Sequence, residues 1–282
     1  MGLGRKIRNI IDYCESVRNN KNIQPVTVVK YQSDLLAEKN ALIIGGTGGI
    51  GFAIAKNILD AGANVVITGT RDETINKAKS IIKRKGDQSC NGMILDLLDV
   101  NSFSSKLIEA EKLIGRRIDV VVNAAGYHGD EPFGKVTEKS YDRVLDINLK
   151  GVYFMTQAAG NYMKLNNIKG HILNVSSAAS LKPAWTPYEV SKWGVRGITL
   201  GAADELVSYG IVVNAIGPGP VATRMLGYNQ GDSLYTDCVP TERFATPDEI
   251  AQLAVIMVSD MCNLVIGDTF YITGGSGTVK YR

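Results

Sequence analysis

The feature that most constrains the fold is a glycine-rich turn at residues 45–51, which follows an apolar run at residues 41–44 and precedes an apolar, helix-compatible segment. Five of its seven residues are glycine, in two overlapping spacings, G-x-G-x-x-G from Gly46 and G-x-x-x-G-x-G from Gly45. Such glycines let the backbone approach a pyrophosphate closely, and the N-terminus of the following helix supplies N–H donors and a positive dipole. The order of strand, turn and helix favours a dinucleotide site over a flexible turn without a ligand.

Apolar, β-rich runs alternate with helix-compatible segments along the rest of the chain. Strands are expected at residues 41–44, 64–68, 93–95, 120–123, 171–175, 211–215 and 269–272, and helices near residues 50–61, 72–84, 101–115, 138–166, 188–209 and 247–259. This alternation predicts a parallel sheet covered on both faces, and an apolar content of 45% is sufficient for its core. We therefore predict an α/β fold, a single-domain Rossmann-type doubly wound sheet of seven mainly parallel strands with helices on both faces.

The sequence divides into an N-terminal extension at residues 1–32 and a dinucleotide-binding catalytic domain at residues 33–282. In the extension, apolar residues recur at helical spacing from Leu3 to Val17 with basic residues between them, which predicts a short amphipathic helix. We expect the extension to be dispensable for chemistry. Its expected role is attachment to the enzyme's own surface, to a neighbouring subunit or to an anionic membrane surface.

Charge and cysteine content exclude several classes of protein. The net charge is +3 and the first 25 residues account for all of it, so the body lacks the basic excess typical of nucleic-acid-binding proteins. No uncharged apolar run reaches the roughly 18 residues that a membrane span needs. The four cysteines are far apart, which is typical of reduced thiols in a cytoplasmic protein. No metal site is expected.

A tyrosine and a lysine four residues apart, Tyr188 and Lys192, would share one face of a helix. A free tyrosine has a pKa of about 10, which is too high for proton transfer near neutral pH. A nearby ammonium group favours the phenolate and lowers that pKa, so the pair is a candidate general acid and base. By itself the pair is a weak signal, because helices carry such pairs on solvated faces by chance.

With the glycine turn and this pair, the chain resembles the short-chain dehydrogenase/reductase family over about residues 36–277. Further matches follow in the family's order: Asp96 after the third strand, Asn123-Ala124-Ala125-Gly126 after the fourth, Asn148 on a helix, Asn174-Val175-Ser176-Ser177 after the fifth and Pro218-Gly219-Pro220-Val221-Ala222-Thr223 after the sixth. The resemblance implies a nicotinamide cofactor held by Gly45, Thr47, Gly49, Ile50, Gly51, Arg71, Asp96, Leu97, Asn123, Ala124, Gly126, Tyr188, Lys192, Pro218, Gly219, Val221 and Thr223.

The resemblance also implies a mechanism that interconverts a small-molecule carbonyl and an alcohol. Ser177 would hydrogen-bond the carbonyl oxygen and Tyr188 would protonate it as hydride reaches carbon. Lys192 would lower the tyrosine pKa and bind the nicotinamide ribose, and Asn148 would hold a water that links Lys192 to solvent. The family commonly forms homodimers or homotetramers. The alternatives are a non-catalytic nucleotide-bound sensor or scaffold of the same fold and a sugar-modifying isomerase or dehydratase. Relatives of the latter kind usually need more than the roughly 60 residues that follow Thr223.

Four departures from the family pattern are visible, three in the motifs and a fourth in the short segment at residues 224–240. Ile44 replaces a threonine before the first glycine, which should remove one loop hydrogen bond. Ala124 replaces the second asparagine of N-N-A-G. Only 11 positions separate Ser177 from Tyr188, so the loop between them is trimmed and Ser176 remains a lesser candidate for the catalytic hydroxyl.

The end of the second strand bears on the choice of cofactor. Members that prefer NAD usually place an acidic residue there for the ribose 2′-hydroxyl. Here Gly69 takes that position, and the Arg71 guanidinium two residues later suits the 2′-phosphate of NADP. If the strand end is aligned differently with the family pattern, Asp72 would bind the ribose 2′-hydroxyl of NAD. An acid at this position is better explained as the first residue of the next helix, where the helix dipole favours it. NADP is therefore expected, and NAD is the alternative.

The substrate pocket is less defined. The irregular segment at about residues 217–246 lies beyond the sixth strand and is a candidate lid, but its part at residues 224–240 is short, which suggests an open pocket. The residues considered for lining the pocket or packing the lid are Trp185, Met225, Leu226 and Tyr228. His128 follows the fourth strand closely enough to meet a substrate, with a surface-loop histidine as the preferred interpretation.

Overall fold

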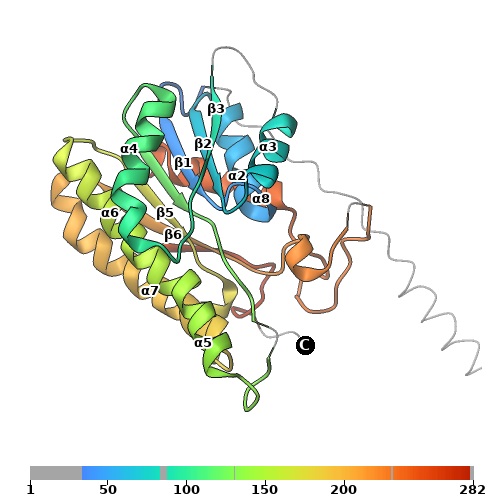
Figure 1. The fold of residues 1–282 in the computed structure, drawn as a ribbon. Helices are drawn as coiled ribbons and strands as arrows, with labels where there is room; N and C mark the ends of the chain where they lie inside the picture. Colours follow the sequence, from blue (N-terminus) through green and yellow to red (C-terminus); the bar gives the residue numbers. More distant parts are fainter. Residues whose placement is uncertain (1–33, 83–87, 130, 230, 280–282) are drawn as a thin grey trace, which may run out of the picture.

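A computed structural model describes residues 34–82, 88–129, 131–229 and 231–279 (Figure 1). The N-terminal extension and its expected amphipathic helix lie outside these residues. Within the described ranges, no helix is long and apolar enough to cross a membrane. Seven strands form one sheet in the order β3-β2-β1-β4-β5-β6-β7, and every neighbouring pair is parallel. The strands are β1 Asn40–Ile44, β2 Asn64–Gly69, β3 Cys90–Ile94, β4 Val120–Asn123, β5 His171–Val175, β6 Val212–Pro218 and β7 Thr269–Ile272.

Helices cover both faces of the sheet (Figure 1). They are α2 Gly49–Asp60, α3 Asp72–Ile81, α4 Phe103–Ile114, α5 Glu138–Leu145, α6 Gly151–Leu165, α7 Pro187–Leu206 and α8 Pro247–Met257. The apolar sides of α2, α3 and α8 pack into one core, and those of α4, α6 and α7 into the other. The predicted single-domain, doubly wound seven-stranded α/β fold is confirmed.

The central strand β1 shows why its sequence is continuously apolar. Ala41 and Ile43 point into the first core, while Leu42 and Ile44 point into the second. All four side chains are buried, because a strand with helices on both faces has no solvent side. This accounts for unbroken apolar runs in place of polar–apolar alternation.

The expected long helix at residues 138–166 is instead three elements. α5 ends at Leu145, a π-helical turn spans Asp146–Lys150, and α6 begins at Gly151. A π-helical turn widens the helix by one residue, and such turns are frequent at functional sites. Here the wide turn carries Asn148, whose side chain is fully buried.

The chain reverses its direction of winding at the boundary between β1 and β4. From β1 it proceeds outward to β3, and it then returns to β4 and proceeds outward to β7. In open α/β sheets a crevice forms at such a reversal, outside the carboxyl ends of the strands. The glycine-rich turn and the residues after β4 meet at this edge.

Close packing fixes the backbone of the glycine-rich turn. Gly45 has a φ of +78°, and a Cβ there would lie 2.6 Å from the Ala125 Cα. A Cβ on Gly51 would overlap the carbonyl oxygen of Gly45. Gly48, by contrast, is extended with a φ of −162°, and nothing lies within 4 Å of its Cβ position.

Two matched substitutions test this steric account. Gly51→Ala should lower the free energy of unfolding by about 1–3 kcal/mol, because the added methyl must displace backbone. Gly48→Ala should stay within about 0.5 kcal/mol of wild type, because its methyl enters open space. Urea unfolding of both variants without added nucleotide measures the difference, and equal stabilities would contradict the assignment.

Candidate active site

The residues singled out in the sequence converge at the carboxyl edge of the sheet. A Cβ at Gly51 would lie 3.3 Å from the Ala124 Cβ, and one at Gly49 would lie 3.7 Å from the Thr223 Cγ2. The glycine-rich turn therefore touches both the segment after β4 and the loop after β6. Gly219 in that loop packs against the backbone of Thr273, 2.8 Å from its Cβ position. Pro218 ends β6, and Val221 is bridged to Ala245.

The turn begins at a hydrogen bond from a neighbouring strand. The N–H of Gly45 donates to the Thr68 hydroxyl on β2 at 3.3 Å. Ile44, the residue before it, has no hydrogen-bonding side chain. A hydroxyl group from β2 therefore accepts a hydrogen bond at the start of the turn, next to Ile44.

The end of β2 lies beside the turn. β2 ends at Gly69, and a Cβ there would lie 2.8 Å from the Thr47 Cγ2. Arg71 is exposed and immediately precedes α3, and its carbonyl oxygen accepts a hydrogen bond from the Thr74 hydroxyl at 2.8 Å. Asp72 is the first residue of α3, as expected for an acid that opens a helix.

Asp96 and Leu97 follow β3 and differ in exposure. Asp96 is exposed, and its carboxylate accepts a hydrogen bond from the N–H of Leu98 at 3.0 Å. Leu97 is buried, and its side chain lies against Gly151, where a Cβ would come within 2.8 Å of it. Of these two residues, Asp96 is therefore the one whose polar side chain is accessible to solvent at this edge of the sheet.

A buried polar network joins the ends of β4 and β5. The Asn123 amide donates to the Asn174 Oδ1 at 2.8 Å and to the Thr156 hydroxyl at 3.2 Å. The Asn174 amide in turn donates to the Thr199 hydroxyl on α7 at 3.1 Å. The Asn123 side chain is buried in this network and ties strands and helices together.

Asn148 clamps the segment that follows β4. Its Oδ1 accepts a hydrogen bond from the Tyr127 N–H at 2.7 Å, and its Nδ2 donates to the Tyr127 carbonyl at 2.8 Å. A Cβ at Gly126 would lie 3.7 Å from the Asn148 Oδ1 and 3.9 Å from the Lys192 Nζ. Gly126 therefore leaves the space in which the asparagine and the lysine approach each other.

Tyr188 and Lys192 both lie on α7 and face the site. The Lys192 ammonium is buried, donates to the Val175 carbonyl at 2.9 Å and lies 5.6 Å from the centre of the Tyr188 ring. The Ser177 hydroxyl forms a hydrogen bond with Tyr188 and accepts one from the Ala179 N–H at 3.1 Å. Ser176 is buried and donates to the Lys192 carbonyl at 3.1 Å, so Ser177 is the hydroxyl beside the phenol.

Burial controls the ionisation of this pair. It raises the pKa of the Tyr188 phenol, with Ser177 acting in the opposite direction and the Glu189 carboxylate in the same direction. It also lowers the pKa of Lys192 to about 8. Burial is the largest effect on the phenol, so its net pKa shift is upward, and the lowering of this pKa by Lys192 stays a prediction.

Two residues that support the site carry no recognisable sequence signal. The Ser180 hydroxyl donates to the Ser177 carbonyl at 2.8 Å and shares a 2.9 Å hydrogen bond with the Tyr271 hydroxyl on β7. The Tyr271 ring also covers Gly217, where a Cβ would lie 2.5 Å from it. The last strand thus holds the turn that carries Ser177.

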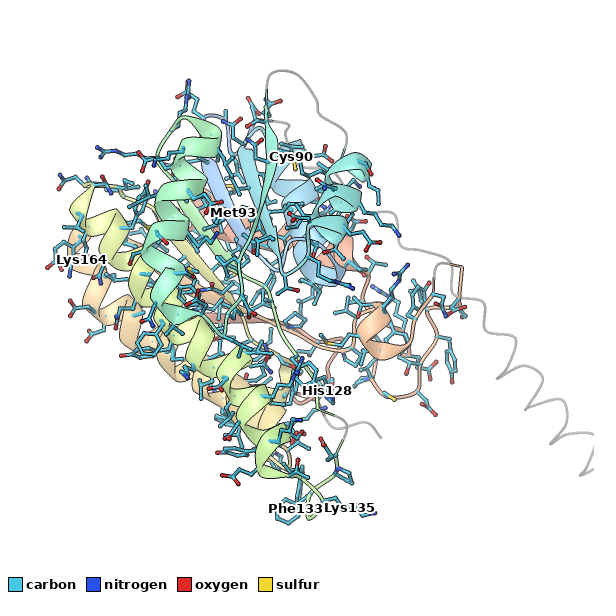
Figure 2. The ribbon with its side chains drawn as sticks, in the orientation of Figure 1. Cys90, Met93, His128, Phe133, Lys135 and Lys164 are labelled. Carbon is cyan, nitrogen blue, oxygen red and sulfur yellow. The ribbon has the colours of Figure 1, made fainter. Side chains whose placement is uncertain are left out.

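His128 lies closer to the site than the sequence suggested. It is exposed, as expected of a loop histidine, yet its ring centre is 4.6 Å from that of Tyr188 (Figure 2). Further out, Trp185 is 60% exposed and packs edge-on against Phe133 at 6.3 Å between ring centres.

Among the remaining candidates for the pocket, Met225 and Leu226 are exposed. Tyr228 packs near Phe244, with 6.5 Å between ring centres. Hydrogen bonds between Ala222 and Ala245, and between Ala245 and Pro220, hold together the two ends of the expected lid segment.

Comparisons with known proteins agree with this geometry. The family model described as short chain dehydrogenase matches residues 39–233. A 3-oxoacyl-(acyl-carrier-protein) reductase of Aquifex aeolicus is 30% identical over 244 residues, 85% of this chain and 98% of the relative. Galactitol 2-dehydrogenase of Agrobacterium fabrum is 34% identical over 256 residues, 86% of this chain and 98% of the relative. The crystal structure of a short chain dehydrogenase from Bacillus anthracis superposes with a TM-score of 0.77 at 29% identity, covering 86% of this chain and 98% of the other.

The lowered pKa of Lys192 makes a prediction about stability. Between about pH 8 and the ordinary value of 10.5, the unfolded chain binds the lysine proton and the native chain does not, so stability rises with pH. Across this pH range, the free energy of unfolding of the wild type should rise by up to about 3 kcal/mol relative to that of Lys192→Met. Urea unfolding at several pH values measures it. Lys56→Met, at an exposed position on α2, is the control, and its free energy of unfolding should depend on pH as that of the wild type does. If the pH dependence of Lys192→Met also parallels that of the wild type, the buried ammonium is refuted.

Proposed function

The chain belongs to the short-chain dehydrogenase/reductase family, and on that premise we propose that it is an NADP-dependent enzyme that interconverts a carbonyl and an alcohol. Its relatives are oxidoreductases of this family. The observation that carries the proposal is the meeting of Ser177, Tyr188 and Lys192 at the carboxyl edge of the sheet. A scaffold that only bound a nucleotide would not require this arrangement.

The glycine-rich turn fits a dinucleotide. Gly45 and Gly49 have positive φ values, and Gly48 and Gly49 are exposed at the N-terminus of α2. Backbone N–H groups at a helix N-terminus favour a pyrophosphate. We infer that the adenosine side lies along Arg71 and Asp96, and the nicotinamide side along Gly126, Lys192 and the loop of Pro218, Gly219, Val221 and Thr223. A bound nicotinamide supplies the hydride.

The side chains of the site act on the oxygen of the substrate. Burial keeps the Tyr188 phenol protonated at neutral pH. Because the same burial makes the phenol a weaker acid, delivery of its proton to the carbonyl oxygen depends on stabilisation of the phenolate by Lys192. Ser177 donates a hydrogen bond to the same oxygen, where negative charge develops. The Lys192 ammonium stabilises the resulting phenolate, and Asn148 holds the backbone beside it.

Removing the proton donor tests this mechanism. Tyr188→Phe should lower turnover by at least 10²–10⁴-fold while NADPH binding survives, because the phenol is the only proposed acid. Steady-state rates and fluorescence titration with NADPH measure the two effects. Lys192→Met is the companion variant and should impair both turnover and NADPH binding. A Tyr188→Phe rate within tenfold of wild type would exclude the role.

We propose that Arg71 selects NADP. It is exposed next to the end of β2, where a guanidinium can pair with a 2′-phosphate that carries roughly two negative charges. Such charge-assisted hydrogen bonds contribute about 1.5–3 kcal/mol, or roughly ten- to hundredfold in affinity.

The measurement is catalytic efficiency with NADPH and NADH, for wild type and Arg71→Ala. The substitution should lower the catalytic efficiency with NADPH by roughly ten- to hundredfold and leave that with NADH almost unchanged. The loss with NADPH should be smaller at high salt. A wild type that favours NADH, with both cofactors affected alike by the substitution, would indicate that Asp72 or another group reads the ribose.

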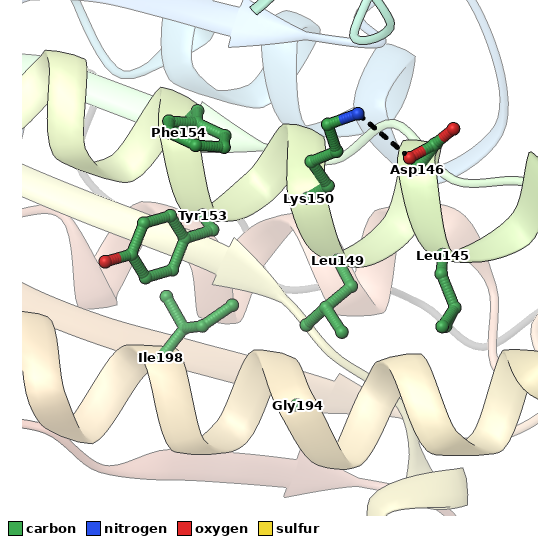
Figure 3. A pocket seen from close by; sticks show the side chains of 8 residues that line it. All are labelled: Leu145, Asp146, Leu149, Lys150, Tyr153, Phe154, Gly194 and Ile198. Atoms are coloured by element: carbon green, nitrogen blue, oxygen red, sulfur yellow. Dashed lines mark hydrogen bonds and ion pairs between the residues drawn. The ribbon is translucent and has the colours of Figure 1, made fainter. Parts of the chain in front are cut away.

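The outer faces of α6 and α7 support a homodimer or homotetramer. A shallow apolar pocket there is lined by Leu145, Asp146, Leu149, Lys150, Tyr153, Phe154, Gly194 and Ile198 (Figure 3). Tyr153 is 48% and Leu200 55% exposed, and apolar patches of this kind mark protein interfaces. Light scattering should give the mass of two or four chains and a smaller mass for Tyr153→Lys with Leu200→Lys. A monomeric wild type would contradict the interface.

A further inference from the structure

The ring of His128 lies against the ring of Tyr188. The two ring centres are 4.6 Å apart, and the planes are inclined by 43°. In the described part of the chain, no hydrogen bond to either imidazole nitrogen of His128 is found. His128, labelled in Figure 2, is exposed while Tyr188 is half-buried, so the imidazole is the more accessible of the two rings to a molecule entering from solvent.

The backbone on both sides of His128 is held in place. Tyr127 before it is clamped by the buried Asn148 side chain through two hydrogen bonds of 2.7 and 2.8 Å. Gly129 after it is packed so closely against α5 that a Cβ would lie 3.2 Å from the Val144 Cγ2. The imidazole is therefore presented from a fixed backbone, and a ligand that binds it has little backbone to order.

This position limits what the imidazole can contact. A carbonyl oxygen that accepts a proton from Tyr188 must come within about 2.6–3.2 Å of the phenolic oxygen. Because the two ring centres are only 4.6 Å apart, a substituent on the neighbouring carbon can then come within reach of His128. A neutral imidazole offers one N–H donor and one acceptor nitrogen.

We propose that His128 is a specificity-determining residue that hydrogen-bonds a hydroxyl group on the carbon next to the reacting carbonyl. The substrates selected are then α-hydroxy carbonyl compounds, and the products are vicinal diols. A hydroxyl both donates and accepts, so it can use either imidazole nitrogen, whereas a carboxylate can only accept. Glu131 belongs to the same loop, with its Oε2 3.4 Å from the Cβ position of Gly129, and a second carboxylate near this loop is disfavoured. The inference rests on the proposed role of Tyr188 as the acid.

Matched substrate pairs test it. The pairs are 3-hydroxy-2-butanone with 2-butanone, 2-hydroxycyclohexanone with cyclohexanone, and 2-hydroxyacetophenone with acetophenone, with pyruvate as the carboxylate arm. For every pair that is turned over, the ratio of kcat/KM should favour the hydroxylated member. His128→Phe, which keeps a stacked ring and loses both nitrogens, should lower that ratio about tenfold. The rate with the plain ketone should stay within threefold, and His128→Asn should restore part of the ratio.

Phe133→Leu is the control. Phe133 belongs to the same loop but lies at its tip, away from His128 (Figure 2), so its substitution should leave the ratio within twofold. A ratio unchanged in His128→Phe, or a wild type that prefers the plain ketones or pyruvate, would overturn the inference.

A second measurement separates this inference from the proposed function. The chain has two histidines, so the ring NMR signals of His128 can be assigned by comparison with His128→Phe. In the full-length enzyme with NADP, 2,3-butanediol should shift these signals and 2-butanol should not. If the enzyme reduces nothing in the panel but this selective shift is seen, the proposed function fails and the assignment of His128 stands. If the two alcohols shift the His128 signals equally, or if neither shifts them, the assignment of His128 is overturned whether or not the enzyme reduces the carbonyl compounds.

Discussion

The rest of the structure depends on the close backbone contact between the glycine-rich turn and the segment after β4. Gly45 approaches Ala125, and Gly51 approaches Gly45, at distances that exclude any side chain. This contact lies at the reversal of winding between β1 and β4, so it shapes the crevice into which the carboxyl ends of the strands open. A bulkier turn would separate the nucleotide side of the crevice from the residues proposed for catalysis.

Polar groups inside the sheet edge position the reacting side chains. Asn148 on the π-helical turn fixes Tyr127, and the Asn123–Asn174 network joins β4, β5, α6 and α7. The Val175 carbonyl oxygen holds Lys192 beneath this edge, and burial lowers the pKa of the lysine. Burial of the ammonium opposes folding, while the same burial strengthens its interaction with any phenolate formed on Tyr188.

The sequence was sufficient to predict the fold class, because alternating strands and helices allow few architectures and the glycine-rich turn marks where the alternation begins. It also placed Asp72 correctly at the start of α3. It did not show the π-helical turn at residues 146–150, since the segments on both sides of the turn are helical and the helix continues through it. The link from Tyr271 through Ser180 to Ser177 joins elements about 90 residues apart, and the contact of His128 with Tyr188 depends on loop packing. Neither contact leaves a local pattern. The sign of the tyrosine pKa shift was likewise invisible, because it is set by burial and not by the spacing of two residues.

The central claim is that a nicotinamide bound at the carboxyl edge of the sheet would supply hydride to a carbonyl carbon while Tyr188 protonates the carbonyl oxygen. The most direct test is a single turnover with NADPH carrying deuterium on one face of C4, with each face labelled in turn, followed by mass spectrometry of the alcohol. The account predicts deuterium on the carbinol carbon for one labelled face and none for the other, with the hydroxyl proton taken from solvent. Bound NADPH that stays reduced with every carbonyl compound, or an alcohol without deuterium from either face, would contradict it.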